Sequence, residues 1–125
     1  MAGNDVLKSH KDLDVWKVAM DLAEASYSVT RAFPKDELFG MTSQIRRAAT
    51  SIAANIAEGY GRETTATFIQ FLRIAQGSQK ELETHLLLAE RVGLISTDAN
   101  AKLLTDCERV GRMLRNLIRS LQEKS

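Results

Sequence analysis

The chain has 125 residues, of which 17 are Lys or Arg and 16 are Asp or Glu, and its formal net charge at pH 7 is +1. Its 44% hydrophobic and 26% charged residues are ordinary for one folded domain and exclude a disordered chain. No apolar run approaches the roughly 18 residues that a membrane span needs, and the single cysteine, Cys107, excludes an internal disulfide. Because residues 1–12 also lack the layout of a signal peptide, we expect a cytoplasmic protein with a flexible segment at 1–11 and one domain at 12–125.

Glycine and proline positions divide the chain into segments, because these residues collect where helices stop. Breaks are predicted at 34–40, at 59–61 and at Gly93, which is suited to a helix C-cap, with Ser96 or Thr97 as the next N-cap. The four predicted helices cover residues 13–32, 41–58, 65–92 and 98–123. Strand signals are absent from the sequence, since no stretch alternates cleanly between apolar and polar residues.

Apolar residues recur at three- and four-residue steps in each segment, which is typical of amphipathic helices. In the first segment this stripe is formed by Leu13, Trp16, Met20, Ala23, Tyr27 and Thr30. In the last segment it is formed by Leu103, Cys107, Val110, Leu114, Leu117, Ile118 and Leu121. Four such helices joined by short loops predict an all-α fold, an antiparallel up-down-up-down four-helix bundle.

The first segment carries a second apolar stripe, displaced from the first by well over a quarter turn. It consists of Val15, Val18, Leu22, Ala25 and Val29. A bundle helix in a monomer normally shows one apolar face, so this surplus predicts a surface that another copy of the chain buries, with Val15, Val18, Leu22 and Val29 as the oligomer interface. The alternative interpretation is a wide core contact within a single bundle.

Small and polar residues indicate close packing between the middle helices. Gly77 lies in the middle of the predicted third helix, where glycine costs about 1 kcal/mol relative to alanine, and close packing is the usual reason for such a glycine. Ser78 and Gln79 lie near the apolar stripe of that helix, and Gln44 and Asn55 lie beside the stripe of the second. These four side chains form either a buried polar network between the two helices or solvent-exposed polar positions at the edge of the bundle.

The sequence offers no arrangement of residues typical of a catalytic or metal site. It has two histidines, His10 and His85, and Glu81 lies four residues before His85 rather than the three of a di-iron motif, so a surface helix interaction is expected instead. Cys107 lies on an apolar stripe, where a small buried thiol is expected. We therefore predict no enzyme, no catalytic residue, no metal, no cofactor and no small-molecule substrate.

The near-neutral total charge conceals an uneven distribution. Residues 1–40 hold five basic and seven acidic residues, a net charge of −2, whereas residues 41–125 hold twelve and nine, a net charge of +3. Four of these cations repeat along one predicted helix face: Arg109, Arg112, Arg115 and Arg119. Three more lie in or after the second helix: Arg46, Arg47 and Arg62.

The arginine row can be interpreted in two ways. Guanidinium groups on a rigid helix match phosphate geometry and can follow a nucleic-acid backbone, which makes the seven arginines candidate nucleic-acid contacts. The alternative is a solvated face whose cations complement the C-terminal end of the helix dipole. Assembly of several copies would repeat the row and favour the first interpretation.

The sequence resembles a known family along nearly its whole length from about residue 12. Residues 33–49 (FPKDELFGMTSQIRRAA), continuing through 51–52 (SI) to 55–59 (NIAEG), resemble the signature of the bacterial four-helix bundle proteins encoded in intervening sequences of 23S ribosomal RNA genes. Further matches are found at 12–16, 71–82, 113–114 and 117–118. This resemblance implies a ring-like homopentamer. It extends to accessory proteins of diversity-generating retroelements, which implies basic surfaces that bind nucleic acid and a reverse transcriptase.

The resulting hypothesis is a non-enzymatic, homo-oligomeric helical scaffold that binds structured RNA, associated with ribosomal RNA, or a nucleoprotein. Arg46 and Arg47 match the Arg-Arg motif of the family, and they serve either nucleic acid or salt bridges between subunits to Glu58 or Glu63. The alternative function is a protein–protein adaptor without a nucleic-acid role. The expected partners are copies of the chain itself and RNA or a nucleoprotein, with no membrane.

Overall fold

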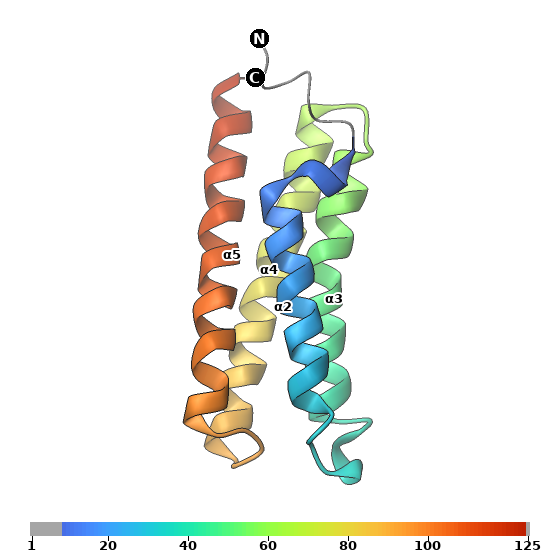
Figure 1. Cartoon of the computed structure of the whole chain (residues 1–125). Coiled ribbons are helices and arrows are strands. Elements are labelled where there is room, and N and C mark those ends of the chain that lie inside the picture. The colour runs from blue at the N-terminus through green and yellow to red at the C-terminus, as the bar shows by residue number, and fades with distance from the viewer. Residues whose placement is uncertain (1–8, 125) are drawn as a thin grey trace.

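The computed structural model describes residues 9–124, which form four long helices and two short 3-10 turns (Figure 1). In chain order these are η1 (His10–Asp12), α2 (Asp14–Thr30), η2 (Lys35–Glu37), α3 (Met41–Tyr60), α4 (Thr65–Arg91) and α5 (Thr97–Lys124). The four long helices begin and end within two residues of the predicted bounds, and residues 9–124 contain no strand. Of the segment predicted to be flexible, residues 1–8 lie outside the described residues and 9–11 belong to η1 and its cap.

Consecutive long helices run antiparallel, as the predicted bundle requires (Figure 1). Contacts join α2 to α3, α3 to α4, α4 to α5 and α5 back to α2, so the four helices enclose one core. No helix within residues 9–124 combines the length and apolar character needed to cross a membrane.

The core face of α2 coincides with neither predicted apolar stripe and takes residues from both. The face of α2 in the core is formed by Val15, Ala19, Leu22, Ser26 and Thr30. On the stripe predicted to face the core, Met20 is 44% exposed and Tyr27 is 40% exposed. Ser26 and Thr30 tolerate burial because their hydroxyls donate to the carbonyls of Leu22 and Ser26, each at 2.8 Å.

This rotation of α2 determines where the predicted oligomer interface lies. Val15 and Leu22 are 4% and 1% exposed, so the core of a single chain covers them and a second copy cannot contact them in this fold. Val18 and Val29 are half-buried and pack against the same core. The wide core contact therefore accounts for Val15 and Leu22, and exposed apolar side chains occur elsewhere on the surface.

The turn between α4 and α5 is built from the predicted caps. Gly93 has φ of +82°, and the backbone N–H of Leu94 donates to the carbonyl of Ala89 at 2.9 Å, which closes a Schellman motif. Ser96 precedes α5 and its Oγ accepts from the backbone N–H of Ala99 at 3.1 Å, the N-cap arrangement.

The Glu90 carboxylate ties the end of α4 to the start of α5. Its Oε1 accepts from Asn100 Nδ2 and its Oε2 from Thr97 Oγ1, both at 3.0 Å. These hydrogen bonds, that of Asn100 above all, hold the pKa of Glu90 below its usual value because they favour the charged form.

The pH dependence of stability follows from this lowered pKa. Glu90 contributes stability above its ordinary pKa of 4.5, and the contribution is lost as the pH falls through the lower value of the folded state. We expect the stability difference between the wild-type chain and a Glu90→Gln variant, measured by urea unfolding, to shrink between roughly pH 6 and pH 3. The matched control is Glu63→Gln, at an exposed glutamate, and a pH-independent difference for Glu90 would contradict the prediction.

Two glycines have roles different from those predicted. Gly59 does not break a helix: α3 continues through it, and a Cβ there would lie 2.6 Å from the Cβ of Phe71 on α4. A Cβ on Gly77 would meet no atom within 4 Å, so close packing within the chain does not explain that residue. The close approach of α4 to α5 occurs at Gly111 instead, where a Cβ would lie 3.0 Å from the side chain of Gln79.

Polar side chains connect α4 to both of its neighbours. Ser51 and Ser78 share a hydrogen bond of 2.8 Å across α3 and α4, and Asn55 Nδ2 donates to Ser51 Oγ at 3.0 Å, so the predicted network forms in part, while Gln44 is exposed and accepts from Arg47. Towards α5, Gln79 Nε2 donates to the carbonyl of Cys107 at 3.0 Å. Cys107 is fully buried, and this burial raises the pKa of its thiol to about 12.

Candidate nucleic-acid interface

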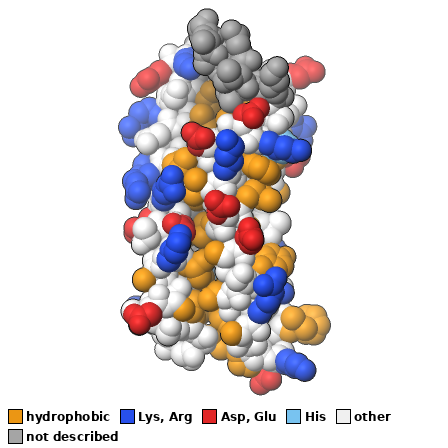
Figure 2. Space-filling view, in the orientation of Figure 1, with side chains coloured by type: hydrophobic (Ala, Val, Ile, Leu, Met, Phe, Trp, Pro, Cys, Tyr) orange, Lys and Arg blue, Asp and Glu red, His pale blue; other side chains and the backbone are white. Residues whose placement is uncertain are grey.

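The arginine row lies on the solvent face of α5, opposite the buried stripe. Arg109, Arg112, Arg115 and Arg119 are all exposed. At a rise of about 1.5 Å per residue the row covers roughly 15 Å of the helix. Within residues 9–124, no carboxylate forms an ion pair with any of the four. Figure 2 shows Lys and Arg side chains along the edge of the molecule that α5 forms, where an anion can reach them.

Two of these arginines also border a shallow groove between α4 and α5. Arg112 and Arg115 line it together with Lys80, and its volume is about 300 Å³. Glu83 and Glu108 line the same groove, and Lys80 Nζ lies 3.3 Å from Glu83 Oε1. The groove therefore carries both signs of charge, with three cations against two carboxylates.

Uncharged contacts hold α5 against α4 beneath the row. The small Gly111 lets the side chain of Gln79 lie against α5, and Gln79 bonds to the backbone carbonyl of Cys107. The remaining contacts are those of the buried apolar residues Leu103, Val110, Leu114 and Ile118. The position of the row therefore depends on buried packing rather than on surface ion pairs.

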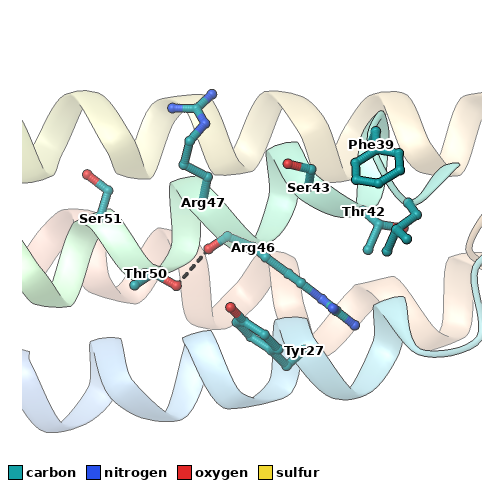
Figure 3. Close-up of a pocket in the computed structure, with 9 residues that line it drawn as sticks. Tyr27, Phe39, Thr42, Ser43, Arg46, Arg47, Thr50 and Ser51 are labelled. Atoms are coloured by element: carbon teal, nitrogen blue, oxygen red, sulfur yellow. Dashed lines mark hydrogen bonds between the residues drawn. The ribbon is translucent and has the colours of Figure 1, made fainter.

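Arg46 is oriented by contacts with α2 rather than by an ion pair. Its side chain is half-buried between α2 and α3, its Nε donates to Thr30 Oγ1 at 2.9 Å, and its guanidinium carbon lies 4.6 Å from the centre of the Tyr27 ring. The Thr30 hydroxyl donates to the Ser26 carbonyl and so can only accept from Arg46. Figure 3 shows Arg46 extending over Tyr27 towards the end of the bundle where the α2–α3 turn lies.

Arg47 and Arg62 are engaged in ion pairs within the chain. Arg47 Nη2 lies 3.0 Å from Glu81 Oε2 on α4, and it also donates to Gln44 Oε1 at 2.5 Å. Arg62 Nη2 lies 2.7 Å from Glu58 Oε2, and its guanidinium lies 5.0 Å from the centre of the Phe71 ring. These partners compensate part of their charge, so both are weaker candidates than the α5 row.

The glutamate and histidine considered for a metal form the surface pair predicted from the sequence. Glu81 Oε2 lies 3.4 Å from His85 Nε2 and accepts from Arg47 as well. No group of three His, Cys, Asp or Glu side chains within the described residues is placed to hold a metal ion.

Two aromatic residues near Arg46 were not identified as candidate site residues from the sequence. Tyr27 was expected in the core and instead lies under the Arg46 guanidinium. Phe39 lies in the turn before α3 and is 92% exposed, more than any other large hydrophobic residue described. Its position directly before Gly40 placed it in the predicted loop, but the sequence did not show that it would be exposed, since Phe33 of the same connection is buried.

Comparison with known proteins supports the fold and the family. Residues 11–116 match the family model described as 23S rRNA-intervening sequence protein. The chain is 28% identical to a protein of unknown function from the S23 ribosomal protein family of Bacteroides thetaiotaomicron, known from its crystal structure. That match covers 83% of this chain and 97% of the other, with a TM-score of 0.75. No curated protein matches the chain.

Proposed function

Since the chain belongs to the family of 23S rRNA-intervening sequence proteins, we propose that it is a non-enzymatic helical scaffold that binds structured RNA, ribosomal RNA foremost, through its arginine-lined surfaces. The observation that carries the proposal is the row of four exposed arginines on α5 without an ion pair to any described residue. A guanidinium row on a rigid helix suits the regularly spaced phosphates of a nucleic-acid backbone. Such binding follows the backbone and shape of the RNA rather than its base sequence.

The salt dependence of binding tests this proposal. We expect a fluorescently labelled 23S rRNA fragment to bind in anisotropy titrations, with log K falling linearly with log salt. Four phosphate contacts on duplex RNA correspond to a slope of about −3.6 for each bound copy if the B-DNA coefficient applies. Absence of binding at low ionic strength would refute the proposal. Binding that does not depend on salt would show that the arginines do not contact the phosphates.

The scaffold is proposed to contain several copies of the chain, five by the family resemblance. Exposed apolar side chains support assembly, because a monomer gains nothing from presenting them to water. They are Met20, Leu38, Phe39, Ile74, Leu87, Leu88 and Val92. Assembly would present one α5 row per copy and make the basic surface multivalent. Light scattering is expected to give a molar mass that is a multiple of 13.9 kDa, and a mass of one chain would exclude the oligomer.

The same apolar residues favour a second candidate function, that of a protein–protein adaptor. Ile74 and Leu88 lie on α4 and Val92 directly follows it, whereas the arginine row belongs to α5. If the chain proves monomeric and does not bind RNA, these exposed apolar residues would be available to bind a different protein. Complexes that persist after nuclease treatment would then favour the adaptor.

A further inference from the structure

Two adjoining cavities lie where α2 turns into α3. The larger, about 650 Å³, is lined by Tyr27, Phe39 and residues of α3. The smaller, about 260 Å³, is lined by Arg31, Lys35 and other residues of the turn. Three residues line both cavities: Leu38, Thr42 and Arg46. The two adjoining cavities are together called the hollow, and their lining includes the cations Arg31, Lys35 and Arg46 and the exposed aromatic side chain of Phe39.

The cationic side is prepared for an anion. Arg46 is half-buried and oriented by Thr30 and Tyr27, yet within residues 9–124 it has no carboxylate partner, in contrast to Arg47 and Arg62. The bond to Thr30 uses Nε and leaves the two terminal nitrogens as donors. A guanidinium already fixed in orientation loses less freedom when it binds, which favours a bidentate contact to phosphate.

The aromatic side offers a stacking surface. Phe39 is 92% exposed and lines the same cavity as Arg46. In Figure 3 the Arg46 side chain extends towards the end of α3 where Phe39 and Thr42 lie. An exposed aromatic ring accepts any unpaired base, because every base has a π-face.

We propose that this hollow holds one unpaired nucleotide of a bound RNA, with its phosphate at Arg46, Arg31 and Lys35 and its base stacked on Phe39. The inference rests on the proposed RNA binding and adds that the chain recognises a single-stranded element at the α2–α3 turn, on the side of the bundle away from α5, since in the described part of the chain α3 makes no contact with α5. A second copy of the chain is the other conceivable occupant. A copy that covered Phe39 with apolar side chains alone would bury the Arg46 charge without compensating it, which is costly, whereas a nucleotide satisfies both groups. A copy that brought a carboxylate to Arg46 would compensate it, and the molar-mass experiment below detects that outcome.

The first test uses free mononucleotides and does not depend on RNA binding. In NMR titrations of the full chain we expect AMP to bind about tenfold more tightly than either adenosine or inorganic phosphate, with shifts concentrated at residues 31–46. Phe39→Ala is expected to reduce AMP affinity to that of phosphate, and Phe39→Trp to restore it. Equal affinities for AMP and phosphate, or shifts outside this segment, would overturn the inference.

The second test compares two RNAs, a blunt duplex and the same duplex with a four-nucleotide single-stranded extension. We expect the wild-type chain to prefer the extended RNA about tenfold and Phe39→Ala to remove the preference without changing duplex binding. Arg46→Ala should also remove it. The matched control is Arg73→Ala, an exposed arginine on α4. Circular dichroism verifies that each variant is folded.

The outcomes separate this inference from the proposed function. If neither RNA binds while AMP does, the hollow is confirmed and the scaffold role of α5 fails. If both RNAs bind equally and Phe39→Ala has no effect, RNA binding holds and the nucleotide site is overturned. If Phe39→Ala lowers the molar mass of an assembly and leaves AMP binding unchanged, Phe39 contacts another copy and the inference is overturned as well.

Discussion

Replacement of the four α5 arginines by glutamate is expected to abolish binding of a 23S rRNA fragment, with a loss of affinity of at least about 100-fold at low salt. The variant carries Arg109→Glu, Arg112→Glu, Arg115→Glu and Arg119→Glu. Each removed phosphate contact lowers the salt slope by about 0.9, and each new carboxylate repels the backbone. All four positions are exposed, so the bundle is expected to remain folded.

The control for this experiment carries the same change in net charge at other exposed cations. It combines Lys11→Glu, Lys17→Glu, Arg73→Glu and Arg91→Glu. We expect the control variant to keep part of the wild-type affinity for the RNA, and this remaining affinity to depend on salt, as measured by anisotropy over the same salt series. An equal loss in both variants would show that total charge, rather than the row on α5, governs binding.

Replacement of Gly59 by alanine is expected to lower the free energy of unfolding by about 1–3 kcal/mol. The new Cβ would lie 2.6 Å from the Cβ of Phe71 and 3.3 Å from the carbonyl oxygen of Phe68, so α3 and α4 must separate. Urea unfolding followed by circular dichroism measures the change. Gly59→Ala with wild-type stability would contradict the close approach of the two helices.

Gly77 provides the matched control for this substitution. It lies inside a helix like Gly59, but a Cβ there meets nothing within 4 Å. Gly77→Ala is therefore expected to raise the free energy of unfolding by about 0.4–1 kcal/mol, because alanine is the better helix former and narrows the unfolded ensemble. The two alanine variants should move stability in opposite directions.

The helices could be predicted because the local spacing of residues indicates where each helix ends and which of its faces is apolar. On α5 a single apolar stripe opposes the arginines, so both the buried face and the exposed row followed from the sequence. On α2 two apolar stripes compete, and spacing alone does not decide which faces the core. The face of α2 that packs in the core includes Ser26 and Thr30, two polar residues that a search for apolar spacing passes over. Their burial is possible because each hydroxyl donates to a backbone carbonyl of the same helix.

Contacts between distant segments account for the remaining differences. Gly59 was expected to end a helix because glycines collect where helices stop. Its observed role, the close approach to Phe71, involves a residue of the next helix and cannot be seen in the local sequence. The ion pair of Arg47 with Glu81 likewise joins α3 to α4, and no local sequence pattern predicts it. The candidate site was therefore predictable where it lies on one helix, and the hollow at the α2–α3 turn, which combines residues of two helices and a loop, was not.

The joint between Gln79, Gly111 and Cys107 has a consequence for how the arginine row responds to ionic strength. It contains no charged group, and water does not reach its core, so dissolved ions have little to act on there. If the chain binds RNA as proposed, salt is therefore expected to weaken the attraction between the row and the RNA while the packing of α5 on α4 stays unchanged.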